Sequence, residues 1–240
     1  PIASALGCLT PEDLELGVGV LDLGRGITGL AIYRDFRILG THCFEWGGYH
    51  ITRDVAAGLQ VSFEEADELI LEYGISEACI HEEFDESSEM SRSESDDMSS
   101  RVKLRSNVPG SPSVVDRADL DGIVYERAKE LLVKVRQHIL ARGLTKNLVR
   151  GIVLTGGAAS IKKYTDLAEA VFQVPCRIGM PTGVEVLPNG VESPEFSASI
   201  GIARHAFEFR SAARHGRIEP RGSMVSVSRR AARFLKRYFL

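Results

Sequence analysis

Three apolar segments near the start of the chain predict an antiparallel meander. Residues 17–23, 28–35 and 37–45 alternate or run apolar, and short turns separate them. The turn at residues 24–27 joins two strands directly. No helix follows it and no GKS or GKT is present, so it is neither a Walker loop nor a dinucleotide fingerprint. The opening stretch PIASALGCLT is typical of a helix end, and ITRDVAAGL after the meander predicts a short helix.

A capping box predicts the next helix. Ser62 begins an S-x-x-E sequence followed by apolar residues at helical spacing, so a helix is expected at about 63–73, stopped by Gly74. Residues 75–81 are then expected to form a strand. The stretch 82–100 is acidic and serine-rich, with too little apolar surface for a core, and we expect a disordered loop there.

Strand and helix patterns alternate in the second half of the chain. Apolar residues at helical spacing, buried apolar runs and an N-cap Ser with Pro after it define the boundaries. The predicted elements are strands at 101–108, 151–155 and 176–179, and helices at 117–142, 161–173 and from Ser193 to about 209.

Charge is unevenly distributed along the chain. The net charge is −4, but residues 210–240 hold nine Arg or Lys and one acid, a net +8, which leaves −12 on residues 1–209. This indicates a basic tail on an acidic body. The four cysteines show no CxxC pair, so a zinc site is not expected, and no apolar run is long enough to span a membrane.

The last sixteen residues, VSVSRRAARFLKRYFL, form an amphipathic pattern on a helical wheel. An apolar arc opposes a cationic side, which favours a helix lying in a membrane interface over one packed on the body or a nucleic-acid tail. We expect a linker at 210–223, a membrane-targeting helix at 224–240 and no nucleic-acid partner. The residues assigned to anionic membrane lipid are Arg229, Arg230, Arg233, Phe234, Leu235, Lys236, Arg237, Tyr238 and Phe239.

The hairpin turn after the first strand is a candidate phosphate site. Gly24 and Gly26 allow successive backbone N–H groups to point at one spot and form an anion nest. Arg25 or Thr28 would add a donor, and Asp22 at the strand end would hold Mg²⁺ through water.

A second glycine turn, Gly156-Gly157, follows the strand at 151–155 and would let a flat base or sugar lie against the main chain. Either turn alone is more often only a turn. The pair is stronger evidence, because each follows a buried strand and the two are expected to converge on one nucleotide. A side chain at Gly156 is expected to occupy the adenosine's place without disturbing the fold.

These motifs carry a resemblance. LDLGRGITGLAIY resembles the second phosphate loop of the actin/Hsp70/hexokinase superfamily, and GIVLTGGAASI resembles its adenosine loop. More narrowly, GIVLTGGAASIKKYTDLAEAVFQVPCRIGMP and SFEEADELILEYG resemble the FtsA family of bacterial cell-division proteins. The resemblance covers nearly all of the chain outside the acidic loop and the linker.

The resemblance implies an α/β fold: an actin/Hsp70-like (ribonuclease H-like) half with an inserted α+β subdomain and a C-terminal amphipathic helix. Residues 1–50 with 145–209 would form the nucleotide-binding (2A-like) subdomain, and residues 51–144 the inserted (2B-like) one. The family's first half, with the first phosphate loop, has no counterpart in the sequence, so we expect a C-terminal fragment.

The resemblance also implies a function. The protein would bind ATP and Mg²⁺ jointly with the missing half, self-associate into filaments, and tether FtsZ to the cytoplasmic face of the bacterial inner membrane at the division septum. Arg127 matches a position implicated in binding the FtsZ C-terminal peptide, and Arg117 is the weaker candidate for this contact. The expected nucleotide-binding residues are Asp22, Gly24, Arg25, Gly26, Ile27, Thr28, Asp67, Ile70, Gly156, Gly157 and Ala158.

Three departures from the family pattern bear on activity. Ile27 and Gly29 replace a Thr and an Asp of the usual phosphate turn, Ile70 stands where many relatives carry Lys, and the first half is absent. No catalytic residue is assigned, and at most a weak ATPase is expected. The alternatives are a pilus-assembly-type actin-like adaptor, a nucleotide-independent membrane scaffold, or half of a sugar or acetate kinase.

Overall fold

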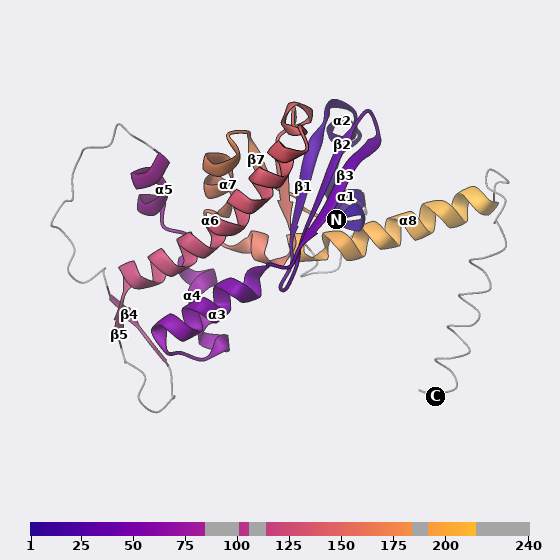
Figure 1. Cartoon of the computed structure of the whole chain (residues 1–240). Coiled ribbons are helices and arrows are strands. Elements are labelled where there is room, and N and C mark those ends of the chain that lie inside the picture. Colours follow the sequence, from indigo (N-terminus) through magenta and orange to yellow (C-terminus); the bar gives the residue numbers. More distant parts are fainter. Residues whose placement is uncertain (85–100, 106–113, 184–191, 215–240) are drawn as a thin grey trace, which may run out of the picture. The chain divides into compact units, whose positions relative to one another are not determined.

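A mixed five-stranded sheet, with strands from both the start and the later part of the chain, organises the fold (Figure 1). We obtained a computed structural model that describes residues 1–84, 101–105, 114–183 and 192–214. The first three strands form the expected antiparallel meander, and the two later strands add to it in parallel. The order is β3-β2-β1-β6-β7, with β1 at Val18–Leu23, β2 at Thr28–Arg34, β3 at Arg37–Phe44, β6 at Ile152–Thr155 and β7 at Cys176–Ile178.

Both faces of the strands β1, β2 and β6 are buried, which explains why these strands run apolar without a polar alternation. Val18 and Val20 point to one face and pack with helix α1 (Ile2–Cys8). Leu21 and Leu23 point to the other face and belong to a larger core. Helices α6 (Arg117–Ala141) and α7 (Tyr164–Phe172) contribute to this larger core, and α7 lies beside the sheet (Figure 1).

A helical group continues the larger core beyond the sheet. Helix α3 (Gly48–Leu59) packs with both α4 (Phe63–Tyr73) and α6. A two-stranded sheet of β4 (Arg101–Lys103) and β5 (Val114–Asp116) lies near the start of α6 (Figure 1). The core residues come from every helix of this group, and one hydrophobic cluster joins them to the sheet. The division into two subdomains at residues 51–144 stays a prediction.

The strand expected at 75–81 is wrong: the chain forms helix α5 (Glu77–Phe84). Ile75 and Ile80 are both buried. Residues five positions apart point to opposite faces of a strand, so a strand would not bury both side chains on one face. Glu77 and His81 form a pair at 3.7 Å, an i,i+4 contact that only a helix provides. Residues 82–84 therefore belong to this helix, whereas residues 85–100 of the expected acidic loop lie outside the described residues.

Two further helices differ from expectation. Helix α2 (Pro11–Leu16) was not predicted, although Thr10 and Asp13 form a capping box around a Pro at the first helical position. The last helix, α8 (Ser197–Arg214), runs five residues past its expected end at about 209, and the linker at 210–223 stays a prediction. The structure also contains short 3₁₀ turns: η1 at Thr145–Asn147 after α6, η2 at Gly157–Ser160 before α7, and η3 at Pro194–Phe196 before α8.

Residues Pro1–Gly201 form one compact unit, and Ile202–Leu240 form a second. Within the second unit the structure describes only the remainder of α8, where Ile202 and Phe207 are exposed. The tail residues from Arg229 to Phe239 lie outside the described residues. In the part of the chain that is described, every helix is too short or too polar to cross a bilayer.

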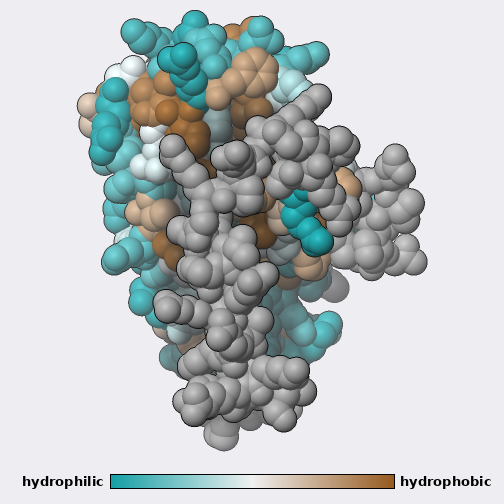
Figure 2. Space-filling model, turned by 90° about the vertical axis from the view of Figure 1, so that its right-hand side faces the viewer, coloured by the Kyte–Doolittle hydropathy of each residue, from teal (hydrophilic) through white to brown (hydrophobic). Residues whose placement is uncertain are grey.

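The edge strand β3 leaves apolar side chains in contact with solvent. Phe36 in the preceding turn and Ile38 and Leu39 in the strand are all more than two-fifths exposed. Figure 2 shows the side of the molecule that this edge borders, with hydrophobic surface set among hydrophilic residues.

Candidate functional site

The two glycine turns lie side by side because the strands that precede them are neighbours. Strand β1 pairs in parallel with β6, and Asp22 stands opposite Thr155 in this ladder. The turn after β1 and the turn after β6 therefore leave the sheet at the same edge. Ligand sites of open α/β sheets form at this edge, outside the carboxyl ends of the strands.

The hairpin turn is fastened to the start of α3. The Gly48 amide donates to the Gly24 carbonyl at 2.9 Å, and the Tyr49 amide donates to the Arg25 carbonyl at 2.7 Å. A Cβ at Gly47 would lie 2.7 Å from the Arg25 carbonyl oxygen, so this close approach requires glycine. The glycine pair before α3 thus fixes the turn against the helix.

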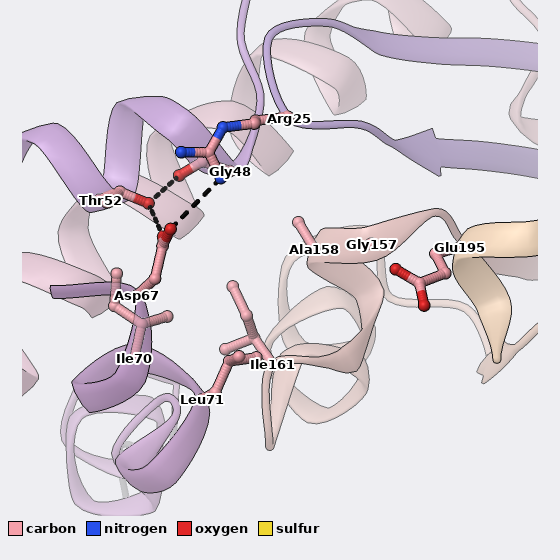
Figure 3. Close-up of a pocket in the computed structure, with 10 residues that line it drawn as sticks. All are labelled: Arg25, Gly48, Thr52, Asp67, Ile70, Leu71, Gly157, Ala158, Ile161 and Glu195. Atoms are coloured by element: carbon pink, nitrogen blue, oxygen red, sulfur yellow. Dashed lines mark hydrogen bonds and ion pairs between the residues drawn. The ribbon is translucent and has the colours of Figure 1, made fainter. Parts of the chain in front are cut away.

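A pocket of about 350 Å³ opens between this turn and η2 (Figure 3). Arg25 comes from the hairpin, Thr52 from α3 and Asp67 from α4, and the three form one polar group on the first wall. Arg25 donates to Asp67 at 3.2 Å, and the Thr52 hydroxyl lies 2.5 Å from the other carboxylate oxygen. Ile70 and Leu71 of α4 continue this wall as an apolar surface.

The opposite wall consists of η2 and one residue of η3. Gly157, Ala158 and Ile161 line it, and Glu195 closes its end (Figure 3). The buried Thr155 hydroxyl lies within 3.0 Å of the carbonyls of Gly179 and Pro194. This network holds the start of η3 against the end of β6 and so positions Glu195 beside the pocket.

Gly156 has a structural role that differs from the expected one. Its φ is 86°, and an added Cβ would lie 2.5 Å from a carboxylate oxygen of Asp22 and 2.6 Å from the Leu23 carbonyl oxygen. It is not among the residues that line the pocket. The expectation that a side chain here would merely fill the adenosine's place is wrong, because the side chain would push the two sheet strands apart.

The hairpin supplies free amides rather than a glycine-dependent nest. The Gly24 amide is used inside the turn, donating to the Ile27 carbonyl at 3.0 Å, and neither Gly24 nor Gly26 has a positive φ. Among the described residues, the amides of Arg25, Gly26 and Ile27 have no hydrogen-bond acceptor. Three consecutive free donors beside an arginine can bind an anion such as a phosphate.

The remaining predicted residues lie near the pocket without lining it. Thr28 is fully buried, and its hydroxyl has no hydrogen-bond partner among the described residues. Asp22 accepts a hydrogen bond from the Ser4 hydroxyl of α1. The structure thus brings Arg25, Asp67, Ile70, Gly157 and Ala158 together around one cavity, and leaves Asp22, Gly24, Gly26, Ile27, Thr28 and Gly156 behind or beside it.

Sequence reasoning missed half of the lining residues. Leu71 could have been found from its place beside the predicted residue Ile70 in the same helix. Gly48 and Thr52 could have been found from their spacing of one helical turn around the start of the predicted short helix. Ile161 and Glu195 carried no recognisable signal, because tertiary hydrogen bonds place them. The missed residues are Gly48, Thr52, Leu71, Ile161 and Glu195.

The residues around the cavity could hold a magnesium ion through its water molecules, but not by direct coordination from several side chains. Among the described residues, no group of three His, Cys, Asp or Glu side chains converges to hold a metal directly. Burial raises the pKa of both the Cys8 and Cys176 thiols to about 12, so neither is a ready metal ligand at neutral pH. Asp22 offers one carboxylate, which would hold a hydrated Mg²⁺ through one of its waters.

The two arginines predicted to bind a partner peptide are held within the protein. Arg127 forms ion pairs with Asp54 of α3 and, at 2.8 Å, with Glu130, and its guanidinium lies 5.0 Å from the Trp46 ring. Arg117 pairs with Asp121 at 2.6 Å and covers the Tyr73 ring. Both side chains remain about a quarter exposed.

Comparison of the fold places the chain among actin-like proteins. MreB5 of Spiroplasma citri bound to AMPPNP superimposes with a TM-score of 0.63 at 17% identity, covering 89% of this chain and 60% of that one. The PilM–PilN type IV pilus biogenesis complex gives 0.57 at 15% identity, covering 85% of this chain and 51% of that one. At these identities the likeness defines the class of fold, an actin-like α/β fold.

The family follows from sequence. The family model described as cell division protein FtsA matches residues 19–201. Cell division protein FtsA of Agrobacterium fabrum is 31% identical over 202 residues, 84% of this chain and 43% of that protein. The FtsA of Borreliella burgdorferi is 28% identical over 239 residues, 100% of this chain and 54% of that protein. The chain belongs to the FtsA family, and it spans about half the length of these relatives.

Proposed function

We propose that this chain forms the nucleotide-binding part of an actin-like cell-division protein. The protein would bind ATP, assemble into filaments and tether FtsZ to the cytoplasmic face of the bacterial inner membrane at the septum. The observation that carries the proposal is the pocket of about 350 Å³, where the Arg25 guanidinium lies beside the apolar side chains of Ile70 and Leu71 and faces the η2 wall. This volume lies at the lower end of the range typical of small-molecule sites.

Each part of the pocket suits one part of ATP. The Arg25 guanidinium in the pocket would hold phosphate oxygens, and the free amides of residues 25–27, on the turn beside the pocket, would add donors. Ile70, Leu71 and Ile161 would cover the base, with Gly157 allowing it to approach the main chain. A bound Mg²⁺ would neutralise phosphate charge, with Asp22 holding one of its waters.

The proposed ATPase activity is weak at most. Gly29 stands opposite Asp22 in the β1–β2 ladder, at the position where the usual family pattern has a carboxylate. Cross-strand neighbours lie about 5 Å apart, so that carboxylate would have stood beside Asp22. Asp22 alone can position a hydrated ion, but it leaves no second carboxylate on that ladder to orient an attacking water.

The proposed FtsZ contact would exploit an arginine that already has a partner. A carboxylate of the FtsZ C-terminal peptide would compete with Asp54 and Glu130 for Arg127. The cavity between α3 and α6 that Arg127 lines, with Gly58 and Ile123 as its apolar part, is the place where such a peptide would lie. Arg117 would contribute less, because Asp121 already holds it closely.

Nucleotide titration of the full-length gene product tests this function. We expect saturable binding of Mg-ATP by calorimetry, and a loss of at least tenfold in affinity for Gly157→Val, whose side chain would enter the pocket. Gly122→Ala, at an open position on α6, is the matched control and should bind as the wild type does.

Each alternative predicts a different result. Absence of ATP binding with intact lipid binding would establish the nucleotide-independent scaffold instead. Membership of the FtsA family argues against the pilus-assembly adaptor and the kinase half.

A further inference from the structure

The side chain of Arg25 is largely exposed, while its main chain is fastened to α3. The Arg25 carbonyl accepts the Tyr49 amide, which anchors the turn on α3. The side chain is 67% exposed, and its guanidinium has two contacts: Asp67 at 3.2 Å and the Tyr49 ring at 5.7 Å. Arg25 can therefore turn about its own side-chain bonds without disturbing the hairpin.

Asp67 does not depend on Arg25 for its orientation. The Thr52 hydroxyl holds one carboxylate oxygen of Asp67 at 2.5 Å, and Thr52 is only 3% exposed. Arg25 binds the other oxygen. If Arg25 departs, that second oxygen becomes free while the carboxylate stays in place.

The Arg25–Asp67 pair is suited to exchange. Both side chains are more than one-third exposed, and ion pairs in such positions are weak. A polyphosphate carries more charge and accepts bidentate hydrogen bonds from a guanidinium. It would also meet the three free amides of the same turn, so the total favours phosphate over Asp67 as the partner of Arg25.

We propose that Arg25 is an exchanging ligand, paired with Asp67 in the pocket without nucleotide and transferred to the phosphates when nucleotide binds. This rests on the proposed function and adds a regulatory element to it. The transfer releases one Asp67 oxygen for a hydroxyl donor of the same ligand. The transfer also breaks the ion pair that joins the hairpin to α4. Because Arg25 leaves Asp67 only for a phosphate, the pocket distinguishes phosphorylated from unphosphorylated ligands through this one residue.

The test uses two probes that separate the ends of the ligand: Mg-triphosphate, which lacks the nucleoside, and adenosine, which lacks phosphate. With the full-length gene product, Arg25→Ala should weaken triphosphate and ATP binding by about tenfold or more and leave adenosine unchanged. Arg105→Ala is the control, since Arg105 forms a more exposed bridge to Glu68 of the same helix at 3.3 Å and does not line this pocket.

A double-mutant cycle identifies the exchange itself. Asp67→Asn removes the competitor, so it should strengthen triphosphate binding by up to about fivefold, but only while Arg25 is present. An equal gain in the Arg25→Ala background would show a general charge effect and overturn the proposal.

The same titrations separate the two levels of inference. Wild-type protein that binds neither ATP nor triphosphate overturns the proposed function and the exchange together. Wild-type protein that binds ATP, with Arg25→Ala binding it equally well, overturns the exchange alone.

Discussion

Two adjacent glycines in the second turn do different things. Gly156 adopts a φ of 86° and lies against Asp22 and Leu23. Among the described residues, a Cβ at Gly157 would instead have within 4 Å only the Cβ of Glu195, 4.0 Å away. In the sequence the two positions look alike, since both are glycines after a buried strand. What separates them is backbone conformation and the distance to the next strand, which only the folded chain defines.

Substitutions at Gly156 and Gly157 should differ in their effects on the free energy of unfolding and on nucleotide binding. Gly156→Ala places a side chain at a positive φ and against the sheet, and should lower the free energy of unfolding by about 1–3 kcal/mol. Gly157→Ala should leave stability within about 0.5 kcal/mol and weaken nucleotide binding. Urea unfolding and ATP titration of both variants check this. Equal stability of the two variants would show that the strand contact at Gly156 can relax.

Asp13 is a fully buried carboxylate with three partners. It accepts from the Thr10 amide at 3.0 Å, from Arg177 at 2.5 Å and from Arg150 at 3.4 Å. Burial alone would raise the pKa of Asp13, but the Thr10 hydrogen bonds and the Arg177 charge outweigh it and lower the pKa. The carboxylate thereby ties α2 to β7, two elements far apart in sequence.

The lowered pKa of Asp13 predicts an acid-sensitive fold. A carboxyl group with a depressed folded-state pKa stabilises the protein above its ordinary pKa of about 3.9, and the stabilisation is lost as pH falls through the folded value. Asp13→Asn should therefore cost about 1–3 kcal/mol at pH 7, and the gap between variant and wild type should narrow below about pH 4. Denaturant unfolding across this pH range measures the gap. A gap independent of pH would mean that the loss is steric.

At the scale of elements, long periodic segments were predictable and short ones were not. The meander and the helix at Arg117–Ala141 follow from apolar spacing over many residues. The eight residues of α5 offered too few positions to separate helix from strand. Helix α2 depends on a local capping box rather than on periodicity.

The candidate site was predictable in outline for a similar reason. Two glycine turns after buried strands indicated one pocket, and adjacent parallel strands bring them together. The residues that complete the walls come from α3, α4, η2 and η3, and their approach is set by packing between elements. No local pattern encodes that packing.

Helices α1 and α8 meet at their backbones through glycine. A Cβ at Gly7 would clash with the Ser197 carbonyl, and a Cβ at Gly201 would clash with the Ala3 carbonyl. Each glycine thus provides the space for the other helix. The crossing holds the start of α8, and with it η3, next to the sheet.

A methyl group at this crossing should be costly. Gly201→Ala is expected to lower the free energy of unfolding by about 1–3 kcal/mol, because the helices must separate. Gly122→Ala, in α6 with no atom within 4 Å of its added Cβ, should instead raise it by up to about 1 kcal/mol. Thermal unfolding of both variants measures the contrast. A neutral Gly201→Ala would show that the crossing can shift.

At the scale of the whole molecule, the acidic body and the basic tail suggest separate tasks. Residues 210–240 carry a net charge of +8, and the rest of the chain carries −12. A single cationic helix contributes only about 1 kcal/mol per basic residue at an anionic surface, part of which is lost in ordering the helix. Firm attachment would then require several tails acting together, as in a filament.

The tail offers a direct test of membrane attachment. Phe234→Glu should abolish liposome binding, because it puts a charge into the apolar arc. Arg233→Ala combined with Arg237→Ala should only weaken binding, mainly on anionic lipid, with a smaller deficit at high salt. Flotation of the full-length gene product measures both.

Other tasks for the tail give other results. A helix packed on the body predicts that Phe234→Glu lowers thermal stability and leaves flotation unchanged. If the tail binds nucleic acid, the arginine substitutions should have the larger effect on binding, and Phe234→Glu should have almost none. Equal flotation of wild type and Phe234→Glu would refute the membrane tether.

The central pairing of the sheet also determines when the pocket can form. Gly19 pairs with Ile152 and Asp22 with Thr155, so the two halves of the site are joined by a loop of about 130 residues. Contacts this far apart in sequence carry a large closure entropy and form late in folding. During synthesis the hairpin of β1 and β2 can form early, but it must wait for more than half of the chain before its ligand site exists. Any nucleotide that binds the pocket therefore stabilises only the finished unit, and would act on a newly made chain as a late check on completed folding.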